Sequence, residues 1–348
     1  MKKQFVLFVS ILFCVSSCAT KRSQEYTGNN GSTPFITREF PASSINEVEA
    51  TTSGGSLVLT GDAGSKAIVE VYVSRDNWSA EKIKQVLEEN YTLDVKVVNG
   101  KLVASAKQKT NFFDWNNQGL SISFKISVPK QVNSNSETSG GSIQLSNLSG
   151  SQTFKTSGGS LSVDNVSGSM VGVTSGGSIS VTNSKDNIDL KTSGGSITAK
   201  DCGGTIKLIT SGGSLDLNNL TGNINAATSG GSIVADNISG TFVTGTSGGS
   251  VKLNGISGNV DATTSGGNMD VRIKSASDYV KLSNNGSINL VLPDGKNYSL
   301  KMKASRIDVP VIKNFQGYMD NKSINGTIGN GGTEINVRSS QQIWLSFE

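Results

Sequence analysis

The sequence predicts an all-β protein that folds as a parallel β-helix, a β-solenoid of 18-residue coils that we expect to be right-handed. The first observation is an internal repeat: Thr-Ser-Gly-Gly-Ser recurs every 18 residues, and Thr-Ser-Gly-Gly-Asn at Thr264 keeps the same step. The second is an alternation of apolar and polar residues inside each repeat, which is typical of strands with one buried face. A short fixed period indicates coils that bury their cores against their neighbours. The repeats start at Thr138, Thr156, Thr174, Thr192, Thr210, Thr228 and Thr246.

Each coil carries two strand patterns nine residues apart, so it is expected to consist of two nonapeptide strands. In the coil that starts at Thr192, the inward pairs are Ile197 with Ala199 and Ile206 with Leu208. Glycines occupy both corners, and we expect positive φ there because glycine adopts it without a Cβ clash. The Asn that follows the first strand in most coils tolerates the left-handed region and can stack as a side-chain ladder.

The ends of the array lack the repeat. Thr52-Ser53-Gly54-Gly55 is an isolated coil start, 86 residues before the regular array. Between the two, Ser79 to Asn90 has the pattern of a short helix, and Asn99-Gly100 predicts a hairpin turn. We expect these segments to form a small helix-hairpin cap, because a solenoid end otherwise exposes unpaired strand edges. Further strands near Tyr298 and Glu334 are expected to cap the other end.

The chain is accordingly divided into five regions. They are a lipoprotein signal peptide (1–17), a lipid-anchored tether (18–44), first strands with the inserted cap (45–137), the regular β-solenoid (138–292) and a C-terminal β cap (293–348).

The first residues predict export and lipid attachment. Lys2 and Lys3 precede an apolar run that is too short to span a bilayer permanently. Val15-Ser16-Ser17-Cys18 follows and resembles the lipobox of bacterial lipoproteins, in which the Cys is acylated. The resemblance implies that Cys18 carries the lipid and anchors the protein in the bacterial cell envelope, at the outer membrane. The alternative is cleavage near Ala19 by an ordinary signal peptidase.

Composition limits the classes of function that the protein can have. The chain has no His and a net charge of only +4, which is too weak for nucleic-acid binding. No coil presents aligned carboxylates or metal ligands, so we expect no catalytic residues, metal or cofactor. Cys202 is the single Cys after Cys18 and falls in an inward column, so we expect it to be a small buried apolar residue.

Several segments resemble the bacterial putative-adhesin family of β-solenoid envelope lipoproteins. They are Ser121–Pro129 (SISFKISVP), the repeated Ser-Gly-Gly-Ser-Ile turns and Gly286–Pro293 (GSINLVLP). The resemblance spans roughly residues 45–345 and implies a β-helix in the cell envelope. It brings no catalytic residues with it.

An aromatic loop is the first candidate binding site. Phe112, Phe113 and Trp115 lie among Asn and Asp residues, a combination that could stack on and hydrogen-bond a sugar. The same aromatics could instead pack the inserted segment onto the first coil as a hydrophobic plug.

An outward apolar strip is the second candidate. Val171, Val173, Ile209 and Val243 fall at outward positions of one sheet, where we expect a contiguous patch that mediates a side-by-side homodimer or partner docking. Residues 74–128 could cover this strip, but we expect them to cap the end of the rod and leave it open.

Two functions of different class are compatible with these features. The first is a non-enzymatic, lipid-anchored adhesin or surface-structural rod that binds a glycan or a protein. The second is a periplasm-facing envelope scaffold or sensor without an external ligand, which the lack of an acidic run in residues 19–26 keeps open.

Overall fold

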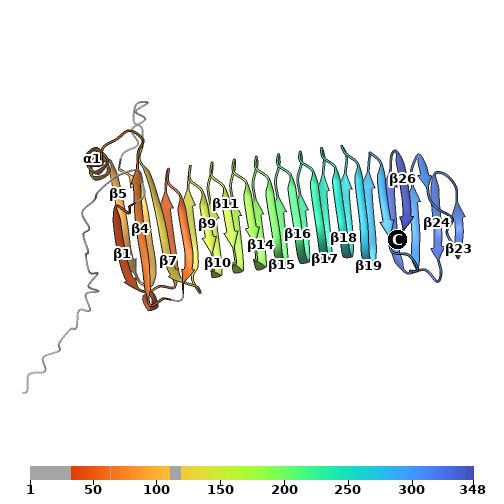
Figure 1. Cartoon of the computed structure of the whole chain (residues 1–348), viewed down its shortest axis with the longest axis horizontal. Coiled ribbons are helices and arrows are strands. Elements are labelled where there is room, and N and C mark those ends of the chain that lie inside the picture. The colour runs from red at the N-terminus through yellow and green to blue at the C-terminus, as the bar shows by residue number, and fades with distance from the viewer. Residues whose placement is uncertain (1–32, 63, 110–118) are drawn as a thin grey trace, which may run out of the picture.

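The computed structural model describes residues 33–62, 64–109 and 119–348, which form an elongated rod of stacked strands (Figure 1). The fold is all-β with a long, mostly parallel sheet, and α1 (Ala80–Asn90) is the single α-helix of these residues. This agrees with the predicted all-β class and its long parallel sheet, whereas the handedness of the coil stays a prediction.

The middle of the rod has the predicted register. Leu161 pairs with Ile143 and with Ile179, one repeat away on either side, and Ile206 pairs in the same way with Ile188 and Ile224. Two parallel ladders result, one for each strand of the coil. Their strands are β8 (Asn133–Thr138), β9 (Ile143–Ser146), β10 (Ser149–Lys155), β11 (Leu161–Asp164), β12 (Ser167–Val173), β13 (Ile179–Thr182), β14 (Lys185–Lys191), β15 (Ile197–Ile209), β16 (Leu215–Ala227), β17 (Ile233–Thr246), β18 (Val251–Thr264), β19 (Met269–Asn284) and β20 (Ile288–Leu292).

The two corners use glycine for different reasons. Gly168 and its equivalents have positive φ, as predicted. The glycine pair of the other corner does not, which corrects the expectation for both corners. At its second glycine, a Cβ on Gly159 would lie 1.9 Å from the carbonyl oxygen of Gly141 in the preceding coil. That glycine is required by the close approach of stacked backbones.

Hydrogen bonds also tie the glycine corner from coil to coil. The Thr156 hydroxyl donates to the Gly141 carbonyl oxygen at 2.8 Å and accepts from the Gly159 amide at 3.2 Å. The same pair of bonds recurs at Thr174, Thr192, Thr210, Thr228 and Thr246. Buried Thr is therefore part of the repeat because each hydroxyl satisfies backbone groups that a tight corner leaves unpaired.

At the N-terminal end the coils are stacked out of sequence order. The first coil, β2 (Glu47–Thr52) with β3 (Leu57–Asp62), lies between β8–β9 and an outer coil formed by β6 (Lys101–Gln108) and β7 (Ser121–Pro129). The chain therefore runs outward after β3 and then returns past it to start the regular array. The predicted isolated coil start at Thr52 is confirmed, and its neighbour on the outer side is a later part of the chain.

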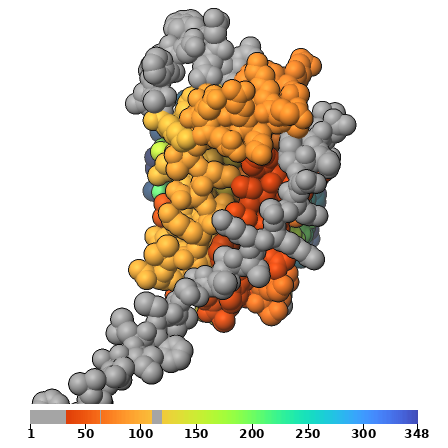
Figure 2. All heavy atoms as spheres, turned by 90° about the vertical axis from the view of Figure 1, so that its left-hand side faces the viewer, coloured from red at the N-terminus to blue at the C-terminus, as the bar shows by residue number. Residues whose placement is uncertain are grey.

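The inserted segment caps this end. Helix α1 begins after Ser79, and β5 (Tyr91–Val98) pairs with β6 around the predicted turn, where Asn99 and Gly100 have φ of 50° and 80°. The antiparallel strand β4 (Lys66–Ser74) covers the outer side of β7. Seen end on, the orange to gold atoms of this segment and the red atoms of the first strands form the face of the rod (Figure 2). The inserted segment therefore lies at the end of the rod.

One boundary needs correction. The sequence pattern assigns residues 18–44 to a tether, but β1 (Ile36–Pro41) and the short 3₁₀ helix η1 (Ala42–Ser44) are part of the fold. β1 pairs antiparallel with β4 from Ile36–Val71 to Pro41–Lys66. The partner strand β4 has no repeat signature, so the sequence pattern did not indicate this pairing.

The C-terminal end repeats the out-of-order stacking. The last strands, β25 (Thr333–Ser339) and β26 (Gln342–Phe347), form a coil between β19–β20 and an outer pair, β21 (Tyr298–Lys303) and β22 (Arg306–Asp308). A hairpin of β23 (Phe315–Met319) and β24 (Ser323–Ile328) lies at the end of the rod farthest from α1 (Figure 1). The region predicted as a C-terminal cap, 293–348, thus contains an interior coil as well as a cap.

Candidate functional site

The outward apolar strip is not contiguous, which corrects the prediction. Val171 and Val173 are 43% and 36% exposed on β12, and Val243 is 41% exposed on β17. The strand register places Asp189, Lys207 and Asn225 between Val171 and Val243 in the same outward column. Adjacent outward residues come from separate repeats, and nothing in an 18-residue period obliges them to be alike. Ile209 is half-buried on the neighbouring column.

Within the described residues the inserted segment does not lie over the strip, because it pairs with the first coil at the end of the rod. The exposed apolar part of the strip is the local pair Val171 and Val173 together with the separate Val243, and the exposed ion pair Lys207–Asp189 (Nζ to Oδ2, 3.4 Å) lies between them on the same ladder. A role of these residues in an interface stays a prediction.

The aromatic loop residues Phe112, Phe113 and Trp115, and the lipid-attachment residue Cys18, lie outside the described residues. The chain that leaves this loop is held close to α1. The Leu120 amide donates to the Tyr91 hydroxyl at 2.9 Å, and the Arg75 guanidinium donates to the Gly119 carbonyl oxygen at 2.7 Å.

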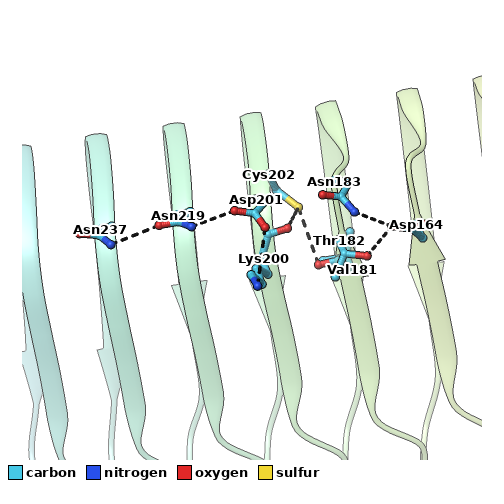
Figure 3. Close-up of polar contacts among 9 residues, drawn as sticks. All are labelled: Asp164, Val181, Thr182, Asn183, Lys200, Asp201, Cys202, Asn219 and Asn237. Atoms are coloured by element: carbon cyan, nitrogen blue, oxygen red, sulfur yellow. Dashed lines mark hydrogen bonds and ion pairs between the residues drawn. The ribbon is translucent and has the colours of Figure 1, made fainter.

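The Asn residues that follow the first strand of most coils form the predicted side-chain ladder. The Asn219 amide donates to Asp201 at 2.8 Å and the Asn237 amide to Asn219 at 3.2 Å (Figure 3). Farther along, Asp164 accepts hydrogen bonds from Thr182 and Asn183, which lower the pKa of its carboxyl group. These side chains bind one another, and no group of His, Cys, Asp or Glu in the described part of the chain could hold a metal ion.

Cys202 lies in the core, as predicted. Its side chain is 4% exposed, and its thiol lies 3.2 Å from the Lys200 carbonyl oxygen and 3.8 Å from that of Val181 (Figure 3). Burial raises the pKa of the thiol, so the reactive thiolate is disfavoured.

A cleft of about 660 Å³ opens at the C-terminal end of the rod. Four segments that are distant in sequence build it: the turn 294–297 after β20, the loop 310–314 before β23, the end of β24 at Ile328, and the end of β26 at Phe347. Its volume falls within the range of small-molecule sites. No predicted site residue lines this cleft.

Tyr298 and Phe347 form an apolar part of the cleft lining. Tyr298 is buried, and its hydroxyl donates to the Pro293 carbonyl oxygen at 2.8 Å. Burial, with a smaller contribution from the negative charge of Asp294, raises the pKa of Tyr298 to about 12. The hydroxyl thus stays protonated, and the ring lies 6.4 Å from that of Phe347 at a tilt of 35°. Val311, 96% exposed, is also among the lining residues.

Each of the two loops that line the cleft carries a Lys followed by an Asn. Lys296 and Asn297 lie on the first loop, and Lys313 and Asn314 on the second. The side-chain amide of Asn297 fills the space beside Gly329. A Cβ added to Gly329 would lie 2.1 Å from the Oδ1 atom of Asn297. Sequence patterns missed these residues, since the segments are aperiodic; the two Lys-Asn pairs were the available signal.

The comparisons with known proteins show at most a similarity of fold. No family model and no curated protein matches the chain. Similar solved structures include a putative cell adhesion protein from Clostridium sporogenes, 10% identical with a TM-score of 0.22 over 90% of this chain and 98% of that chain. A putative lipid binding protein from Parabacteroides distasonis is 15% identical with a TM-score of 0.32, over 90% and 97% of the two chains. A putative adhesin from Bacteroides fragilis is 12% identical with a TM-score of 0.26, over 90% and 96%.

At these identities and TM-scores the likenesses carry no argument about function. The resemblance to the adhesin family therefore stays a prediction, and a function has to be inferred from the residues of this chain. In the described ranges, no helix has the length and apolar character to cross a membrane.

Proposed function

We propose that the protein is a non-enzymatic, lipid-anchored rod of the bacterial cell envelope, held at the outer membrane through Cys18, that presents a ligand-binding surface at its far end. The observation that carries the proposal is that two different features lie at opposite ends of the rod. The chain enters the rod at the capped N-terminal end (Figure 1). The cleft is formed by residues of the C-terminal end.

The length of the rod supports this role. One ladder runs through β7, β3, β9, β11, β13, β15 to β20, β26 and β22. At ~4.8 Å per strand, these layers hold the cleft about 60 Å from the capped end. Continuous hydrogen bonding makes such a stack stiff, so a ligand would be bound well away from the membrane surface.

The non-enzymatic assignment is supported by the residues around the cleft. Asp294 is the single carboxylate side chain among the residues that line it. Glycoside hydrolysis commonly needs a pair of carboxylates, and covalent catalysis needs a nucleophile activated by a base. The lining residues supply neither arrangement.

Anchoring is tested with two cysteine variants. Cys18→Ser should move the protein from the membrane to the soluble fraction or leave an unprocessed precursor. Cys14→Ser, within the apolar run of the signal, should leave it in the membrane and serves as the matched control. Unchanged fractionation of Cys18→Ser would refute the anchor.

The alternative is a periplasm-facing scaffold or sensor without an external ligand. Protease treatment of intact cells separates the two, because a surface rod is cleaved without permeabilisation and a periplasmic one is not.

For the proposed homodimer, Val171→Lys with Val173→Lys should abolish concentration-dependent self-association; a wild-type protein that is monomeric at high concentration contradicts it.

A further inference from the structure

The charge of the cleft is the starting point. Lys296 and Lys313 are exposed, and neither forms an ion pair within the described residues. The carboxylate of Asp294 accepts from the backbone amide of Gly295 at 2.8 Å. Glu348, next to Phe347, has its side chain paired with Arg272, which is not among the residues lining the cleft. Among the side chains that line the cleft, two ammonium groups therefore outnumber one carboxylate, and these side chains favour an anionic ligand.

The polar groups define the ligand further. Asn297 and Asn314 each offer an amide that donates and accepts, Lys296 and Lys313 donate, and Asp294 accepts. A ligand that satisfies such a mixed set needs groups that can both donate and accept, and hydroxyl groups do so. Beside them, the half-buried ring of Phe347, which lies against the buried Tyr298, supplies an apolar surface on which the C–H face of a sugar ring can lie.

We propose that this cleft binds an acidic saccharide, with the carboxylate of the sugar bound by Lys296 and Lys313 and its hydroxyls by Asn297, Asn314 and Asp294. The proposal rests on the ligand-binding rod proposed above and names the class of its ligand. A fatty acid fits less well, since polar side chains occupy both loops that line the cleft.

The test is calorimetric titration of the purified full-length protein in detergent. Tetragalacturonate is the acidic ligand, cellotetraose the neutral one and an acidic hexapeptide the protein-like one. We expect tetragalacturonate to bind in preference to both others, and the affinity to fall as NaCl is raised, since charge attraction is screened.

Matched variants assign the binding to the cleft. Lys296→Gln with Lys313→Gln should weaken tetragalacturonate binding at least about tenfold, because two charge-assisted hydrogen bonds are lost. Lys301→Gln with Lys303→Gln removes the same charge from exposed residues of the neighbouring strand β21 and should leave the affinity unchanged. All four side chains are exposed, so the melting temperature should stay the same.

Three results would overturn the proposal: no binding of tetragalacturonate, equal binding of cellotetraose, or tighter binding of the hexapeptide. Equal loss in both lysine pairs would also overturn it, since the binding would then follow net charge alone. Titration of purified protein does not depend on anchoring. Failure here therefore leaves the Cys18 fractionation result intact, and the reverse is also true.

Discussion

The middle of the rod and its two ends are built from the same stacked strands but in different order. In the middle, each coil follows its neighbour in sequence, and the pairs from β15 to β17 are 18 residues apart. At the ends, β2–β3 lies inside a later coil and β25–β26 lies inside an earlier one. A repeat therefore extends the rod by local addition, whereas an end is closed by contacts between distant segments.

The largest difference between the ends and the middle of the rod is expected when a whole coil is deleted. Ending the chain at Gly332 removes β25 and β26, which leaves β19, β20, β21 and β22 without a partner on one side. We expect insoluble protein, because the core of the C-terminal end would be opened. Deleting residues 193–210 removes one whole coil and restores Thr-Ser-Gly-Gly-Ser at the junction. That variant should fold into a shorter rod. Solubility and small-angle scattering check both, and a soluble, folded truncation would contradict the interior role of the last coil.

The next largest effect is expected in the core of the middle. Ile206 is 1% exposed, so Ile206→Asp places a charge in the apolar stack without a partner. We expect a loss of about 3–5 kcal/mol in the free energy of unfolding. The adjacent outward change Thr205→Asp should cost less than about 0.5 kcal/mol. Urea unfolding followed by circular dichroism measures both; equal effects would mean that the alternation does not define the core.

The glycine corner offers a matched pair of neighbouring residues. A Cβ on Gly195 would lie 2.2 Å from the Gly177 carbonyl oxygen, whereas one on Gly194 meets nothing closer than 3.5 Å. Gly195→Ala should therefore destabilise the protein by about 2–3 kcal/mol, because the coils must move apart. Gly194→Ala should be neutral or stabilise it by about 0.4–1 kcal/mol, since alanine has less freedom when unfolded. The urea midpoints should differ in this order, and reversed midpoints would refute the close-approach argument.

The C-terminal end should respond to alkaline pH through Tyr298. Its pKa is about 12 in the folded protein, above the ordinary value of 10.0, so the folded state holds the proton more tightly. That contribution to stability is complete below pH 10 and is lost as the pH rises toward 12. Tyr298→Phe should unfold with a weaker dependence on pH over this interval. Equal slopes for the two proteins would contradict the burial of this hydroxyl.

The smallest effect is expected where end and middle meet. Ser136, on β8, has a fully buried hydroxyl without a hydrogen-bond partner among the described residues. Ser136→Ala should stabilise the protein by about 1 kcal/mol, because an unpaired polar group is removed. Ser134→Ala on the same strand should destabilise it, since that hydroxyl donates to Gln152 at 2.5 Å. Thermal unfolding compares them, and a destabilised Ser136→Ala would indicate a partner.

The fold was largely predictable because its signals are local. The alternation around Ile206, the helix after Ser79 and the turn at Asn99 each depend on residues close in sequence, and each is confirmed. The apolar strip was only partly predictable. The alternation placed Val171 and Val243 on the outer face, but contiguity depended on the residues that other coils place between them.

By itself, the sequence determined the parallel stack, the length of its coil and the residues of its core. It did so because a repeated pattern specifies how each coil contacts the next. Once that contact is known for one pair of coils, it applies to every other pair in the array. Only the tertiary structure decided the order of coils at the ends, the pairing of β1 and the cleft at Tyr298. These depend on aperiodic segments that meet across long loops, and no local pattern records which distant segment each of them will contact.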